Sequence, residues 1–202
     1  MMRLGIYSHQ HGKIMKKLLC IALLISLAAC SETSPTVDKS IPNTETKVSH
    51  VSAMTKPTAP LSLLTSYKSA AEALIVLIDN GGVDTDIENA SAALVKSAKP
   101  ILRSFIKKFP QCQEYLTALN NAADTIPTLT LAEIETGYHA DGKLPAITDA
   151  NCYHAKDLLV HPATVQAMAK IGINDAAQRA DAKAEIVEVI SHFSQVEQAY
   201  KS

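Results

Sequence analysis

Apolar residues recur every third or fourth position through most of the chain from residue 61 onward, which is the period of an α-helix with one buried face. The first stripe consists of Leu64, Tyr67, Ala71, Leu74 and Ile78. Gly81 and Gly82 follow it, as glycine commonly does where a helix ends. The last stripe, for which Asn174 is the predicted N-cap, consists of Ala182, Ile186, Val189, Phe193, Val196 and Tyr200.

The positions between these two stripes predict further helices. Their apolar stripes are Ile87, Leu94, Ala98, Ile101 and Phe105, then Cys112, Tyr115, Leu119, Ala122 and Ile126, then Leu131, Ile134 and Tyr138. Thr85 with Glu88, and Thr130 with Glu133, have the spacing of capping boxes. Pro100 is expected to kink or split its helix. Residues 149–160 are predicted to be helical, and Pro162 is expected to begin a further helix that ends at Gly172.

No segment has the alternation of a strand, and residues 139–148 have no clear period, so we expect an irregular loop there. The chain is therefore predicted to be all-α, with a bundle of five to seven helices over residues 61–202. Ser, Thr and Pro supply 15 of the 30 residues from Ser31 to Pro60, and Leu, Phe and Tyr are absent there. Such a segment buries too little apolar surface to fold, so it is predicted to be a disordered tether before the bundle.

A different apolar run, KKLLCIALLISLAAC, extends from Lys16 to Cys30. Its uncharged core, Leu18 to Ala29, has 12 residues, whereas a helix that spans a bilayer needs about 20. A short apolar core behind the positive Lys16 and Lys17 is instead typical of a secretory signal peptide. Met15 would be a suitable start for such a signal.

The end of this run, Leu27-Ala28-Ala29-Cys30, resembles the lipobox of bacterial lipoproteins. The resemblance implies that residues 1–29 are a lipoprotein signal peptide, that Cys30 is lipidated, and that residues 30–60 are the lipidated N-terminus and linker. It also implies a lipid-anchored protein of the cell envelope. Ser31, which is not aspartate, implies the outer membrane, facing the periplasm, if the cell is Gram-negative. The alternative is a cleaved signal peptide with a chance cysteine.

Composition limits the partners of the mature chain. Cleavage before Cys30 would leave 173 of the 202 residues, with 15 basic and 20 acidic side chains and thus a net charge of −5. Nucleic-acid binding needs a basic face, so we expect no nucleic-acid partner. Tryptophan is absent and aromatic residues make up 4% of the chain, so stacking platforms for sugars or bases are scarce.

Two cysteines remain after Cys20 leaves with the signal and Cys30 takes the lipid. Cys112 and Cys152 form an even pair in an oxidising compartment, and we predict a disulfide between them. Free thiols and metal-bound thiols are the alternatives.

Potential metal ligands are concentrated between Thr136 and Thr164. The candidates are His139, Asp141, His154, Asp157 and His161, which could bind Zn²⁺ or Cu²⁺ or could ligate haem iron. His154 and His161 would be two helical turns, about 10 Å, apart, which is too far to share one ion directly. In the alternative interpretation both histidines flank the core and Asp157 is a local hydrogen-bond partner.

The motifs of common hydrolases and nucleotide-binding proteins are missing. His192 and Glu188 are four residues apart and are predicted to form a pair on the surface of a helix. We therefore expect a non-enzymatic binding or interaction module without a cofactor. It would be anchored to the membrane through acylated Cys30 and would bind another envelope protein or a small ligand. The alternative function is a metal- or haem-binding protein that uses His139, His154 and His161.

Overall fold

Most positions of the predicted apolar stripes are buried, although Leu131 is 40% exposed and Cys112, Ile126 and Tyr138 lie in short 3₁₀ or π-helical turns. The computed structural model describes residues 59–147 and 149–202, and this part of the chain is all-helical, without a strand. Its α-helices are α1 (Ala59–Asp79), α2 (Asp84–Lys108), α3 (Gln113–Ala122), α4 (Leu131–Ile134), α5 (Ala150–Ile171) and α6 (Ala176–Lys201). The all-α prediction and the number of helices are confirmed for these residues. The predicted signal peptide, the lipidation site at Cys30 and nearly all of the predicted tether lie outside the described residues.

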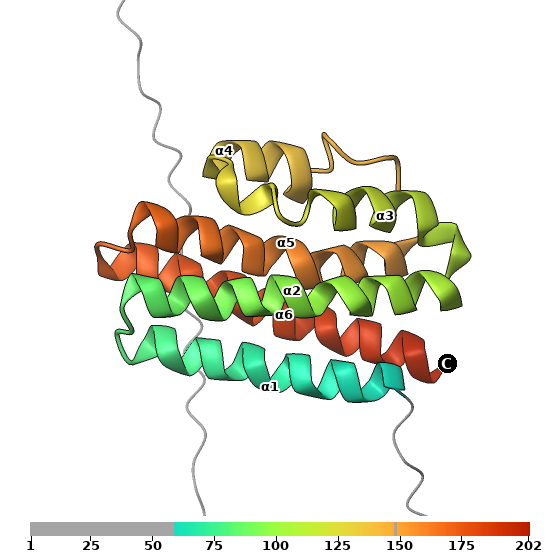
Figure 1. Ribbon diagram of the computed structural model, residues 1–202, viewed down its shortest axis with the longest axis horizontal. Helices are drawn as coiled ribbons and strands as arrows, with labels where there is room; N and C mark the ends of the chain where they lie inside the picture. Colours follow the sequence, from blue (N-terminus) through green and yellow to red (C-terminus); the bar gives the residue numbers. More distant parts are fainter. Residues whose placement is uncertain (1–58, 148) are drawn as a thin grey trace, which may run out of the picture. The chain divides into compact units, whose positions relative to one another are not determined.

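Four long helices form an antiparallel bundle (Figure 1). α1 packs against α2 and α6, and α5 also packs against α2 and α6, so the four helices surround one core. The stripe of α1 is fully buried in that core. Each of its five residues is at most 1% exposed: Leu64, Tyr67, Ala71, Leu74 and Ile78. The segment Leu61–Asp79 is also long and apolar enough to cross a membrane. Core helices of soluble proteins meet the same criteria of length and hydropathy.

The chain between α2 and α5 forms a second layer over α5. It contains α3, α4, the 3₁₀ turns η1 (Pro110–Cys112) and η2 (Ile126–Thr128), and the π-helical turn η3 (Glu135–His139). α5 contacts α2 and α6 on one side and α3, η2, α4 and η3 on the other. Every residue from Ala155 to Val165 is consequently buried, including the polar ones. This enclosure of the middle of α5 is what brings charged side chains into the interior.

The helix ends agree only in part with the sequence prediction. Thr130 and Glu133 form the predicted capping box of α4. Thr85 does not cap α2, because the helix already begins at Asp84, after Val83. The carboxylate of Asp84 accepts a hydrogen bond from the backbone N–H of Ile173 (3.3 Å). α6 is capped by Asp175 and not by Asn174. Gly81 has a φ of 75°, which explains glycine after α1.

The predictions that Pro100 could split its helix and that Pro162 begins a separate helix are wrong. α2 runs without interruption through Pro100, and α5 runs through Pro162. Proline has no N–H, so Pro162 leaves the carbonyl of Leu158, four residues earlier, without its helical donor. The hydroxyl of Tyr67 on α1 donates to this carbonyl at 2.5 Å, inside the core. A side chain from another helix thus replaces the missing hydrogen bond, and α5 stays continuous.

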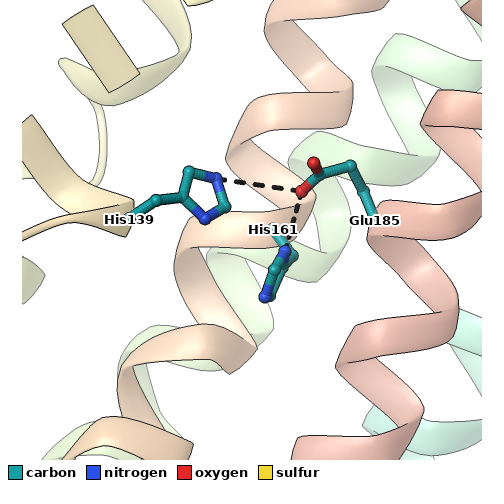
Figure 2. Close-up of side chains that lie close together, drawn as sticks. All are labelled: His139, His161 and Glu185. Atoms are coloured by element: carbon teal, nitrogen blue, oxygen red, sulfur yellow. Dashed lines mark hydrogen bonds and ion pairs between the residues drawn. The ribbon is translucent and has the colours of Figure 1, made fainter. Parts of the chain in front are cut away.

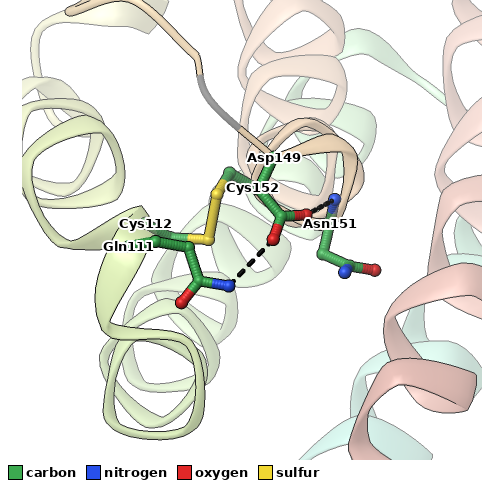
Figure 3. The surroundings of a disulfide bond; sticks show 5 residues. All are labelled: Gln111, Cys112, Asp149, Asn151 and Cys152. Carbon is green, nitrogen blue, oxygen red and sulfur yellow. Dashed lines mark hydrogen bonds between the residues drawn. A yellow bond between two sulfur atoms is a disulfide. The ribbon is translucent and has the colours of Figure 1, made fainter.

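The predicted disulfide is present in the structure. Cys112 in η1 and Cys152 in the first turn of α5 are bonded, with their Cα atoms 5.3 Å apart (Figure 3). Beside it, Gln111 donates to one carboxylate oxygen of Asp149 (2.8 Å), and the other oxygen accepts from the backbone N–H of Asn151 and caps α5. The disulfide therefore fixes the start of α5 to the second layer.

Candidate metal centre

Four histidines from three elements lie in a row between α5, α6 and η3. They are His139 of η3, His161 and His154 of α5, and His192 of α6. The ring centroids of His139 and His161 are 4.9 Å apart, those of His161 and His192 are 5.7 Å apart, and those of His192 and His154 are 5.2 Å apart. Imidazole is the commonest protein ligand for transition metals, so this row is the candidate functional site.

Helical spacing aligns the acidic residues of the two helices with this row. Asp157 and His161 are one turn apart on α5, and Glu185, Glu188 and His192 follow steps of three and four on α6. α5 and α6 pack side by side, so the two sets of side chains meet.

The first donor group consists of His139, His161 and Glu185, which point toward one another from η3, α5 and α6 (Figure 2). Glu185 Oε2 lies 2.7 Å from His161 Nδ1 and 3.8 Å from His139 Nε2. Zn²⁺ binds imidazole nitrogen at about 2.0–2.1 Å, which puts neighbouring ligand atoms of a tetrahedral site about 3.3 Å apart. The distance from Glu185 to His161 is shorter than this ligand–ligand spacing, and the distance from Glu185 to His139 is longer.

The second donor group consists of Asp157, the same His161, and His192. His192 Nε2 lies 3.3 Å from Asp157 Oδ2, and His161 Nε2 lies 3.8 Å from Asp157 Oδ1. Glu188 Oε2 is 3.5 Å from the same nitrogen of His161. Asp157 is 1% exposed, and neither of its carboxylate oxygens accepts a hydrogen bond of good geometry, although Lys156 Nζ lies 3.6 Å from Oδ1. A buried carboxylate without hydrogen bonds is costly unless a cation compensates for it.

The same surroundings shift the protonation of the cluster. Burial raises the pKa of Asp157 to about 6, against the opposing effects of Lys156 and His161. Burial disfavours a charged His161 ring, but its hydrogen bond to Glu185 and the negative charges of Asp157 and Glu185 raise its pKa overall. Burial, followed by the nearby His161 and His154, lowers the pKa of His192 to about 4.

Burial also lowers the pKa values of His139 and His154. A metal ion binds only the unprotonated ring nitrogen. At neutral pH, His139, His154 and His192 are therefore neutral. His139 Nε2 lies 2.9 Å from the hydroxyl oxygen of Thr164, which donates to the carbonyl of Val160, so this nitrogen must give up its hydrogen bond to Thr164 before it can bind an ion.

Lys156 is the one ammonium group of the described residues that is fully buried beside the cluster. It donates to the backbone carbonyl of His139 (2.9 Å) and to Asp141 Oδ1 (3.1 Å), and it lies 3.6 Å from Asp157 Oδ1. The hydroxyl of Tyr115 also donates to Asp141 Oδ1 (2.7 Å). Asp141 is thus a partner of Lys156 and belongs to neither donor group. The contact between Lys156 and the carbonyl holds His139 against α5.

A pocket of about 480 Å³ opens beside the first donor group. Its lining includes Leu131, Glu135, His139, Met168, Asp181 and Glu185. Three of these side chains are acids, so the pocket attracts cations and gives an ion a path to His139 and Glu185.

The sequence prediction identified part of this site. His139 and His161 do come together, with Asp157 beside them, although His139 ends η3 and does not begin the loop. His154 contacts His192 instead, with their Nδ1 atoms 2.9 Å apart. Glu185 was missed, and the interpretation of His192 as a surface residue is wrong, because its side chain is 16% exposed. The spacing of Glu185, Glu188 and His192, with steps of three and four residues, was the pattern in the sequence that could have placed these side chains on one face of a helix.

A scan against protein-family models and searches of curated proteins and of solved structures gave no match to this chain. Fold and site together define a disulfide-linked helical bundle with a histidine- and carboxylate-rich candidate metal centre in its interior.

Proposed function

We propose that the helical domain binds a divalent transition-metal ion, Zn²⁺ or Cu²⁺, through His139, His161 and Glu185. We also propose, from the lipobox resemblance at Cys30, that the protein presents this domain on the extracytoplasmic side of the cell envelope as a lipoprotein. It would then capture metal ions in the envelope. Binding of another envelope protein or of a small ligand, which the sequence alone favours, stays a prediction.

The observation that supports metal binding is the convergence of three ligand atoms from three separate elements. One ligand atom of each of His139, His161 and Glu185 lies within 4.8 Å of the other two, and Glu185 Oε2 is 3.8 Å from His139 Nε2 and 2.7 Å from His161 Nδ1. Two imidazole nitrogens and one carboxylate oxygen are donors that suit Zn²⁺ and Cu²⁺. In catalytic sites, Zn²⁺ has three protein ligands and keeps a fourth position for water or substrate.

The same geometry favours the binding of free metal ions over the binding of haem. Glu185 Oε2 lies 2.7 Å from His161 Nδ1, and Glu188 Oε2 and Asp157 Oδ1 lie 3.5 Å and 3.8 Å from its Nε2, so carboxylate oxygens stand on both sides of the ring where a porphyrin would have to fit. Haem also carries carboxylate side chains, and the neighbouring pocket is lined by Glu135, Asp181 and Glu185. Like charges would repel one another there.

Isothermal titration with Zn²⁺ tests this function on the full chain, purified in detergent and freed of metal with a chelator. We expect saturable binding to the wild-type protein and a loss of at least tenfold in affinity for Glu185→Gln. Glu197→Gln is the matched control, because Glu197 is on the same helix and pairs with Lys201. Absence of Zn²⁺ and Cu²⁺ binding to the wild-type chain would refute the proposal.

A further inference from the structure

The ring of His161 is the one member shared by the two donor groups. Its Nδ1 faces Glu185 at 2.7 Å, and its Nε2 faces Glu188 at 3.5 Å and Asp157 at 3.8 Å. Both nitrogens of the ring therefore point toward carboxylates on opposite sides. A neutral imidazole carries one proton and satisfies one of these sides, a protonated ring satisfies both, and a ring that has lost its protons can bind a cation on each side.

On the basis of the proposed function, we infer that the centre holds two divalent ions, the second bound by Asp157, His161 and His192, with the ring of His161 bridging them. In this arrangement His161 Nδ1 binds the first ion beside His139 and Glu185. His161 Nε2 binds the second ion, after the proton of the ring has been released to solvent.

Asp157 provides the independent observation for the second ion. It is 1% exposed, and its two oxygens, which accept no hydrogen bond of good geometry, are directed toward His161 and His192. Lys156 lies 3.6 Å from one oxygen but gives its hydrogen bonds to Asp141 and to the carbonyl of His139. A cation between Asp157, His161 and His192 would add to the partial compensation that the ammonium of Lys156 gives this buried carboxylate.

The charges of the cluster agree with two ions. The carboxylates Asp141, Asp157, Glu185 and Glu188 surround the cluster, and Lys156 is the one buried ammonium group among them. With neutral histidines, this leaves an excess of three negative charges. Two divalent ions with one deprotonated bridging ring cancel that excess, whereas a single ion cancels the part carried by the more buried carboxylates and leaves Glu188, which is 61% exposed, to the solvent.

His154 supports the second donor group without binding the ion. Its Nδ1 lies 2.9 Å from Nδ1 of His192, so one of the two rings donates to the other. When His192 donates from Nδ1, its Nε2 carries a lone pair directed toward Asp157. A hydrogen bond from the far nitrogen of a ligand ring commonly fixes the orientation and tautomer of that ring. We therefore assign His154 as a positioning residue for His192.

Metal stoichiometry tests the inference on the full chain in detergent, by elemental analysis after equilibration with Zn²⁺. We expect two ions per wild-type chain, one per chain in His192→Gln and one in His139→Gln. His50→Gln, which replaces the one histidine between Cys30 and the described residues, controls for binding outside them and should keep both ions. Circular dichroism verifies that each variant is folded.

Titration of the wild-type chain with Cu²⁺, followed by electron paramagnetic resonance, tests the bridge without a variant. The first equivalent should give the signal of an isolated Cu²⁺ ion, and the second should reduce it, because a bridging imidazolate couples the two spins. Two full, uncoupled signals would overturn the bridge. One ion per wild-type chain, unaffected by His192→Gln, would overturn the second ion and leave the proposed function intact. No bound ion at all would overturn both.

Discussion

Replacement of Asp157 by Asn should make the metal-free protein more stable, although most substitutions in a protein core are destabilising. Asn has nearly the same shape as Asp but no charge, so it removes the cost of burying a carboxylate that lacks hydrogen bonds. Lys156 keeps its contacts with Asp141 and with the carbonyl of His139. The variant should at the same time lose the second metal ion.

The size of the effect follows from the pKa of Asp157, which burial raises from 3.8 to about 6. Each pKa unit corresponds to about 1.4 kcal/mol, so the ionised carboxylate costs the folded state about 3 kcal/mol. Because the folded pKa is raised, the cost is fully present above about pH 6. It decreases as the pH falls toward 3.8 and vanishes below that value, where Asp157 is protonated in both states.

Urea denaturation followed by circular dichroism, in the presence of a chelator and with the disulfide intact, measures this difference. The variant should be more stable by up to about 3 kcal/mol above pH 6, and the two curves should coincide below about pH 4. Asp141→Asn is the matched control and should destabilise, because Asp141 is hydrogen-bonded by Tyr115 and Lys156. If Asp157→Asn is less stable than the wild type above pH 6, the carboxylate is already compensated and the reasoning fails.

Further measurements test other parts of the structure. Tyr67→Phe should lower the free energy of unfolding by about 1–3 kcal/mol in chemical denaturation, because it leaves the buried carbonyl of Leu158 unpaired. Tyr200→Phe is the control and should lower the free energy of unfolding by less, because the Tyr200 hydroxyl donates at 3.3 Å to the carbonyl of Ile101, which keeps its own donor within α2. Equal losses of stability in the two variants would contradict this account of Pro162. Replacement of Cys112 and Cys152 by Ala should cost about 4 kcal/mol by the chain-entropy model for a separation of 40 residues, and an unchanged denaturation midpoint would contradict it. The affinity for Zn²⁺, measured by competition with a chelator, should fall about tenfold per pH unit below the raised pKa of His161, because the ion must displace a proton; a flat profile from pH 7 to 5 would exclude His161 as a ligand.

Local features of the chain determined most of the fold. A helix repeats every 3.6 residues whatever surrounds it, so the stripe from Leu64 to Ile78 identified α1 and its buried face before any packing was known. Thr130 and Glu133 act within one turn, and the sequence therefore predicted their capping box correctly. The number and position of the cysteines were sufficient to predict the bond between Cys112 and Cys152.

Only the tertiary structure decided what depends on neighbours distant in the chain. Pro162 does not break α5, because Tyr67, 91 residues before Leu158, supplies the missing donor. His192 joins the histidine row because α6 packs along α5, and Asp157 is deprived of hydrogen bonds because helices enclose α5 on all sides. A periodic sequence indicates which face of a helix is apolar, but the polar groups that meet in the interior are fixed by the packing of whole helices.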